Sequence, residues 1–117
     1  PTWPATKILW LKNNRPDIYG SAATYMLLKD YVVYYLTGEK KCDMSIATFS
    51  FYFDIYKKTY WQEMLDAIGV KLSQLPELVE PCSVAGVLKP ELATAIKLEP
   101  GTAVNVRALQ RCRDCAA

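Results

Sequence analysis

The chain has 117 residues, of which 51% are hydrophobic and 22% are charged, and its net charge is +2 at neutral pH. This length fits one domain or part of one, and the composition is typical of a globular chain rather than a disordered one. Charges of both signs are interspersed, which argues against an electrostatic nucleic-acid-binding surface. No apolar run approaches the ~20 residues of a membrane span, and no basic-then-apolar leader is visible. We therefore expect a cytoplasmic protein without nucleic-acid or membrane partners.

Four cysteines, Cys42, Cys82, Cys112 and Cys115, are widely and irregularly spaced. A domain with this share of apolar residues needs no disulfide framework, so reduced thiols are expected. Cys112 and Cys115 have the spacing of a metal-ligand pair, but a zinc site normally needs a second pair or histidines, and the chain has no His. The pair also does not follow a strand-to-helix junction, as a redox motif would. We predict no metal site, and the role of the pair stays open.

The first third of the chain is predicted to be mainly helical. A helix is expected over residues 5–14, with Trp10 in the core, and a second over residues 16–23 with a proline at its first position. The apolar run at residues 24–27 favours a short buried strand. Asp30 is a candidate N-cap for a third helix over residues 31–37, which a glycine then ends.

The middle of the chain alternates turn signals with aromatic runs. Residues 43–48 are small and polar and suit a turn with a helix cap. The aromatic-rich run at residues 49–55 favours a strand, with a turn after it. Thr59 and Gln62 have the spacing of a capping box, in which each side chain bonds a free backbone amide. The helix that follows, over residues 60–68, has apolar residues at i, i+3, i+4 and i+7 and ends at Gly69.

The last third is predicted as mixed short elements. One helical turn is expected near residues 73–78, a strand over residues 84–88, a helix over residues 91–96 behind a proline, and a strand over residues 102–106. Residues 107–117 show no clear period and form a divergent tail that we expect to be disordered. Composition and element order therefore predict an α/β fold and nothing narrower.

Several motifs narrow this prediction by resemblance. Residues Pro4, Lys7, Ile8, Trp10, Leu11, Asn13 and Asn14 follow the order of a signature of the FGGY carbohydrate kinases, although Thr2 departs from its first position. Further landmarks resemble the family in the same order: Lys29-Asp30-Tyr31, Leu36-Thr37-Gly38-Glu39, Asp43-x-Ser45-x-Ala47-Thr48, Phe53-Asp54-Ile55, Gly86-x-Leu88 and Pro100-Gly101-Thr102-Ala103-Val104. Residues 1–106 are thus similar to an internal part of the family's N-terminal domain.

The resemblance implies a fold and an activity for a longer parent protein. FGGY kinases have the actin-like ATPase fold, with two ribonuclease-H-like α/β domains, so this chain is expected to hold part of one domain with an incomplete sheet. The family transfers the γ-phosphoryl group of ATP, with Mg²⁺, to a hydroxyl of a sugar or polyol. The run from Trp3 to Lys7 looks more like xylulose or gluconate kinases than glycerol kinases. The implied substrate is therefore a ketopentose or an aldonate.

The catalytic parts of the family are expected to lie outside this chain. Its phosphate-binding turn comes earlier in a family member, and its ATP-binding domain comes later. The general base, an aspartate, is expected shortly after Val106, where this chain reads Leu109-Gln110-Arg111 instead, and no motif supports Asp114 in that role. We therefore assign no catalytic residue and predict that the chain alone binds no cofactor and transfers no phosphate.

The resemblance places two residues near the sugar. Thr2 and Trp3 lie where family members bring a polar or an aromatic side chain to the substrate, so both are candidate substrate-binding residues. Asp43 and Ser45 could suggest catalysis, but no His completes a triad, and helix capping is the preferred interpretation.

A second hypothesis belongs to another class of protein. The chain could be a non-catalytic α/β interaction module that binds a partner through tyrosine-rich faces. Tyr31, Tyr34 and Tyr35 lie on one side of the third predicted helix, where packing with solvated hydroxyls and a sugar-stacking platform are both consistent with the pattern. A part of a larger sheet also leaves an open edge and an apolar face, so homodimerisation is expected.

Overall fold

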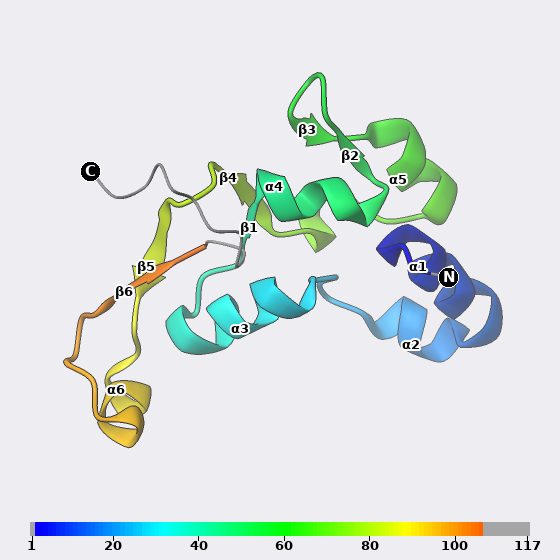
Figure 1. Ribbon diagram of the computed structural model, residues 1–117. Helices are drawn as coiled ribbons and strands as arrows, with labels where there is room; N and C mark the ends of the chain where they lie inside the picture. Colours follow the sequence, from blue (N-terminus) through cyan, green and yellow to red (C-terminus); the bar gives the residue numbers. More distant parts are fainter. Residues whose placement is uncertain (1, 107–117) are drawn as a thin grey trace.

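The computed structural model describes residues 2–106, which form short helices and short strands (Figure 1). The α-helices are α1 (Pro4–Asn14), α2 (Pro16–Ser21), α3 (Leu28–Thr37), α4 (Met44–Ala47), α5 (Gln62–Ile68) and α6 (Pro90–Ile96), with 3₁₀ turns η1 (Thr48–Ser50) and η2 (Leu72–Gln74). The strands are β1 (Lys41–Asp43), β2 (Phe53–Asp54), β3 (Thr59–Tyr60), β4 (Glu77–Val79), β5 (Val84–Val87) and β6 (Ala103–Asn105). No helix in this range is long and apolar enough to cross a bilayer.

The strands form three separate two-stranded sheets. β1 and β4 are parallel with Cys42 opposite Leu78, β2 and β3 are antiparallel with Phe53 opposite Tyr60, and β5 and β6 are antiparallel with an irregularity after Val84. An isolated pair of strands is marginal in water, and a parallel pair normally lies inside a larger sheet. The predicted α/β class with an incomplete sheet is therefore confirmed.

Ten of the buried side chains in residues 2–106 form two apolar clusters. The larger lies between α1 and α5 and is formed by Ala5, Ile8, Tyr52, Leu65, Ile68, Val70 and Leu75. The smaller lies where α3 packs on the β5–β6 pair and is formed by Val33, Ala85 and Val106. In Figure 1, α1 and α5 lie on one side of the molecule and β5 and β6 on the other, with β1 between them.

Helix α1 buries one narrow stripe. Ala5 and Ile8, one turn apart, face the larger cluster, while Trp10 points away and remains 55% exposed. The prediction that Trp10 lies in the core is therefore wrong. The stripe is set by the neighbours that cover the helix, and α2, α5 and η1 contact α1; Figure 1 shows α2 and α5 beside it.

The prediction of a strand at residues 24–27 is wrong, and so is the N-cap role of Asp30. The run is extended without a strand partner, although the amide of Tyr25 donates to the carbonyl of Gln74 over 2.8 Å. Helix α3 begins at Leu28, earlier than expected, so Asp30 lies inside its first turn and caps nothing. The run instead leads into α3, because no strand among residues 2–106 pairs with it.

The aromatic run at residues 49–55 is also mostly not a strand. The hydroxyl of Ser50 donates to the carbonyl of Ala47 and accepts from the amide of Tyr52, and Phe51 adopts a left-handed backbone with φ 68°. These local bonds compete with sheet pairing, so pairing in the run is limited to β2. The helical turn expected near residues 73–78 is present only as the 3₁₀ turn η2, and residues 77–79 form β4.

The capping box at Thr59 and Gln62 is wrong as well. Thr59 pairs in β3 with Asp54, and α5 begins at Gln62 behind Trp61, without a side-chain cap. The end of α5 is as predicted, since Gly69 adopts the left-handed conformation with φ 73°. Gly38 ends α3 in the same way. The predicted helix at α6 and the predicted strands at β5 and β6 are likewise present.

Candidate functional site

The two candidate sugar contacts lie at the start of α1. Thr2 is exposed, and Trp3 is the N-cap residue of the helix. The carbonyl oxygen of Trp3 accepts bonds from the amides of Thr6 and Lys7, at 3.2 and 3.3 Å. The indole ring lies 5.6 Å from the ring of Phe51 and is 42% exposed. The backbone of Trp3 is therefore fixed, while one part of its ring stays available to solvent.

A hollow of about 220 Å³ begins at the next residue. It lies between the first turns of α1 and the extended run that leads into α3, and its lining is formed by Pro4, Lys7, Ile8, Tyr25, Met26, Leu27, Leu28 and Tyr52. Burial raises the pKa of Tyr52, so its phenol stays protonated at neutral pH. One ammonium, two phenols and several apolar side chains suit a small polar molecule with an apolar side.

A second feature is a buried charge cluster around Lys29. The Nζ atom of Lys29 donates to Asp43 Oδ2 at 2.6 Å and to the carbonyl oxygen of Val106 at 2.9 Å, and it lies 3.3 Å from Asp30 Oδ1. Both carboxylates are 1% exposed, whereas the lysine side chain is 21% exposed. One ammonium thus joins the start of α3, the end of β1 and the residue after β6.

Asp43 has a capping role that the sequence predicted. Its Oδ1 accepts bonds from the amides of Ser45 and Ile46, at 2.8 and 3.0 Å, and from the Ser45 hydroxyl, and it thereby caps α4. Burial by itself would raise the pKa of Asp43, but the bonds from Lys29, Ser45 and Ile46 lower it overall. The carboxylate is therefore ionised at neutral pH and already occupied at both oxygens.

Asp30 has a different environment from Asp43. Within residues 2–106 neither of its oxygens accepts a hydrogen bond of normal geometry, and its polar neighbours are the thiol of Cys42, the ammonium of Lys29 and the backbone amide of Leu27. Burial raises the pKa of Asp30, and these neighbours reduce that shift. Burial also raises the pKa of the Cys42 thiol, so this cysteine is neutral and unreactive at neutral pH.

The described residues do not offer a site that fits Mg²⁺ or the phosphates of ATP. Residues 2–106 contain no group of three or more side chains arranged to hold a metal ion. Asp30 and Asp43 each have a carboxylate oxygen within 3.3 Å of the Lys29 ammonium. Because an ammonium lies against both carboxylates and residues 2–106 supply no third ligand beside them, the pair is a structural cluster rather than a magnesium site.

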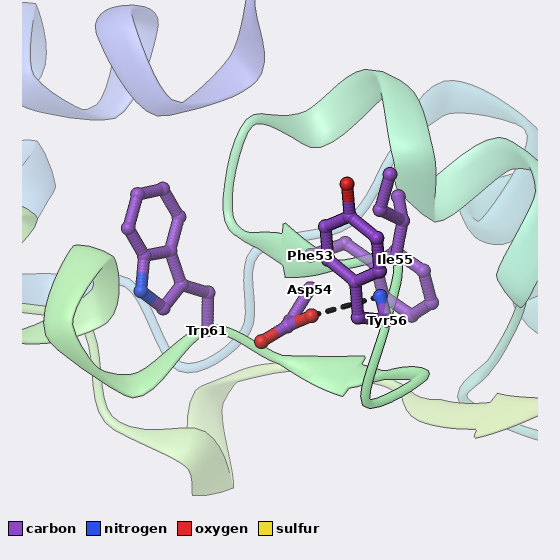
Figure 2. Close-up of a pocket in the computed structure, with 5 residues that line it drawn as sticks. All are labelled: Phe53, Asp54, Ile55, Tyr56 and Trp61. Carbon is purple, nitrogen blue, oxygen red and sulfur yellow. Dashed lines mark hydrogen bonds between the residues drawn. The ribbon is translucent and has the colours of Figure 1, made fainter.

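A third feature is a hollow of about 340 Å³ at the β2–β3 turn, lined by Phe53, Asp54, Ile55, Tyr56 and Trp61. Figure 2 shows the ring of Trp61 on one side of the Asp54 carboxylate and the ring of Tyr56 on the other. The sequence analysis did not find this hollow. Its three rings belong to different predicted elements, Phe53 to a strand, Tyr56 to the turn after it and Trp61 to the next helix, and the β2–β3 turn brings them to one hollow.

The comparisons with known proteins decide the family. The family model described as "FGGY family of carbohydrate kinases, N-terminal domain" matches residues 1–109. The chain belongs to the FGGY family of carbohydrate kinases. The resemblance and the actin-like fold inferred from the sequence are thereby confirmed.

Individual FGGY relatives give the same result. A xylulose kinase of Lactococcus lactis is 38% identical over 92 residues, which is 79% of this chain and 18% of that protein. The crystal structure of a gluconate kinase from Lactobacillus acidophilus superimposes with a TM-score of 0.87 at 28% identity, over 91% of this chain and 22% of that one. A xylulose kinase from Brucella ovis superimposes with a TM-score of 0.83 at 34% identity, over 89% of this chain and 22% of that one. The FGGY chain therefore spans about a fifth of the relatives it matches.

The structure brings some FGGY landmarks together and leaves others apart. Lys29 and Asp43, from two separate landmarks, meet in the charge cluster. Thr2 and Trp3 lie elsewhere, at the start of α1. The link from Lys29 to Val106 was not predicted, because a lysine in a helix is usually solvated and no spacing rule connects residues so far apart. Cys112, Cys115, Asp114 and the tail over residues 107–117 lie outside the described residues.

Proposed function

We propose that this chain is part of an ATP-dependent sugar kinase that transfers the γ-phosphoryl group of ATP to a hydroxyl of a ketopentose such as xylulose or an aldonate such as gluconate. The observation that carries the proposal is the family match over residues 1–109. The names of the relatives support the substrate class, since they include xylulose kinases and a gluconate kinase. On this proposal the parent protein acts in the cytoplasm in carbohydrate metabolism.

In the parent, ATP and Mg²⁺ are held by segments that this chain does not contain. The Lys29 ammonium lies against both Asp30 and Asp43, and residues 2–106 contain no group of three or more side chains that could hold the metal. The chain's own contribution is one wall of the sugar site and a framework for the segments on either side. Because the segments that hold ATP and Mg²⁺ lie elsewhere in the parent on this proposal, the chain alone transfers no phosphate.

Thr2 and Trp3 are the proposed contacts with the sugar. A partly exposed indole offers an apolar face to the C–H groups of a sugar, and a threonine hydroxyl offers one donor and two acceptor lone pairs. The neighbouring hollow beside Lys7 leaves space for the polar end of the substrate. An aldonate carboxylate would gain most from the Lys7 ammonium.

The test uses the parent reading frame, with an ATP-coupled assay on xylulose, gluconate and glycerol. We expect turnover with xylulose or gluconate, no turnover by the 117-residue chain, and a severalfold higher KM in the parent for Trp3→Ala. The matched control is Trp10→Ala, because Trp10 is an exposed indole further along α1 that does not line the hollow, and its loss should leave the KM unchanged. Sugar-dependent turnover by the purified chain, or a parent inactive on all three substrates, would contradict the proposal.

The alternative function is a non-catalytic interaction module. What favours it is the outer face of α3, where Leu28, Tyr31, Val32 and Tyr35 are exposed. The same face, with the edges of three two-stranded sheets, supports a proposed homodimer of the isolated chain. A coding sequence bounded by a natural Met codon and a stop codon at these residues would favour the module. Light scattering that finds a monomer at high concentration would count against the dimer.

A further inference from the structure

The hollow at the β2–β3 turn combines aromatic walls with one carboxylate. Phe53, Tyr56 and Trp61 supply the rings, and Asp54 is held between Trp61 and Tyr56 (Figure 2). The carboxylate has restricted access to water, since the Asp54 side chain is 19% exposed. The volume of the hollow, about 340 Å³, is within the range of small-molecule sites.

The two oxygens of Asp54 are used differently. Oδ1 accepts bonds from the amides of Tyr56 and Lys57, at 2.9 and 3.0 Å, and these bonds lock the turn. Oδ2 lies 4.0 Å from the Nζ atom of Lys57, a side chain that is 74% exposed. The amide bonds, with the charge of Lys57, lower the pKa of Asp54, so the carboxylate is ionised at neutral pH. Oδ2 therefore keeps acceptor capacity in a residue that lines the hollow.

This arrangement has the chemistry of an ammonium site. Aromatic faces attract cations through their quadrupole, and a fixed carboxylate adds an ion pair. A guanidinium would need both oxygens for its forked geometry, whereas an ammonium needs only one. The chain's own Lys57 shows that an ammonium is tolerated beside Oδ2, and its exposure shows that it is held weakly.

We propose that the hollow formed by Phe53, Asp54, Tyr56 and Trp61 binds small alkylammonium ions, with the cation at Asp54 Oδ2 and the alkyl chain against the rings. The inference goes beyond the kinase proposal and does not depend on it. It assigns a second ligand site, distinct from the hollow at the start of α1.

The experiment titrates the purified chain with butylammonium chloride at constant ionic strength and follows the indole N–H signal of Trp61 by NMR, assigned with Trp61→Phe. We expect saturable shifts with a Kd on the order of millimolar, and weaker binding of 1-butanol, which has the same shape without the charge. Asp54→Asn should lower the affinity about threefold, and Lys57→Met should raise it about twofold. The affinity should also fall as sodium chloride is added.

The matched controls are Asp17→Asn and Trp10→Phe, which change an exposed carboxylate and an exposed indole far from the hollow and should leave the affinity unchanged. Asp54→Asn retains an oxygen that accepts from the two amides, so the turn should persist. If this variant does not fold, the affinity of Lys57→Met and the salt dependence of the wild type still test the proposal. Equal affinities for butylammonium and 1-butanol, no salt dependence, or no shift at Trp61 would each overturn the proposal.

Discussion

Replacing Lys29 with methionine tests whether the buried charge cluster organises this chain. The substitution keeps most of the side-chain volume and removes the ammonium that contacts Asp43, Asp30 and the carbonyl of Val106. Two buried carboxylates then remain without a compensating charge. The start of α3, the end of β1 and the end of β6 also lose their common contact.

The expected loss in free energy of unfolding is large. Removing one member of a buried ion pair costs about 3–5 kcal/mol, because the remaining charge stays buried. Lys29 retains partial access to water, so the lower end applies, and we expect about 3 kcal/mol. The double variant Lys29→Met/Asp43→Asn should recover about half of this loss, since the amide still caps α4 but carries no charge.

Urea unfolding followed by circular dichroism measures this loss of stability. Repeating the measurement at two pH values shows whether the lost charge is its cause. The pKa of Asp43 is lowered in the folded chain, so its stabilisation is present above the unfolded value of 3.8 and is lost as the pH falls through the folded value. Without Lys29 the carboxylates prefer to be protonated. The difference between the wild type and Lys29→Met should therefore be smaller near pH 4 than at pH 7.

The control is Arg15→Met, which removes the exposed ion pair between Arg15 and Asp17. Its urea midpoint should stay close to that of the wild type, because water replaces the lost contact. A loss for Lys29→Met no larger than that of the control, or a loss that is the same at pH 4 and pH 7, would refute the argument that this ammonium compensates two buried carboxylates.

Three further substitutions follow from the packing. Asp30→Asn should raise the free energy of unfolding by about 1 kcal/mol at pH 7, and by less near pH 4, as measured by urea unfolding. The reason is that the pKa of Asp30 is raised in the folded chain, so the wild type loses stability as the pH rises from 3.8 to the folded value. A variant less stable than the wild type at pH 7 would contradict this. Gly69→Ala should lower the free energy of unfolding by about 1–3 kcal/mol, because φ is 73° and the new methyl would meet the hydroxyl of Tyr19. Gly101→Ala is its control, with a similar φ and open space around it, and equal losses would exclude a role for the clash. Leu65→Ala should cost about 2–5 kcal/mol, since Leu65 is fully buried in the larger cluster, and a loss below about 1 kcal/mol would argue against that cluster as the core.

The sequence by itself determined the family and where several helices begin and end. Gly38 and Gly69 end α3 and α5 because a left-handed residue without a Cβ is needed there, and a proline opens α2 and α6 as expected. The cap at Asp43 was predictable for the same reason, since it depends on neighbours two and three residues away. Such local rules act over one turn of the chain and are readable without a fold.

Tertiary structure alone decided which residues meet. Whether residues 24–27 or 49–55 form strands depends on a partner strand, and the structure provides one only for β2 within the second run. Trp10 is exposed because its neighbours cover the other side of α1. The contact between Lys29 and Val106 joins residues 77 positions apart, and the aromatic hollow at Asp54 depends on a turn that brings Trp61 and Tyr56 to opposite sides of the carboxylate (Figure 2). Burial and charge compensation are set by the whole fold, so no local pattern could have specified these contacts.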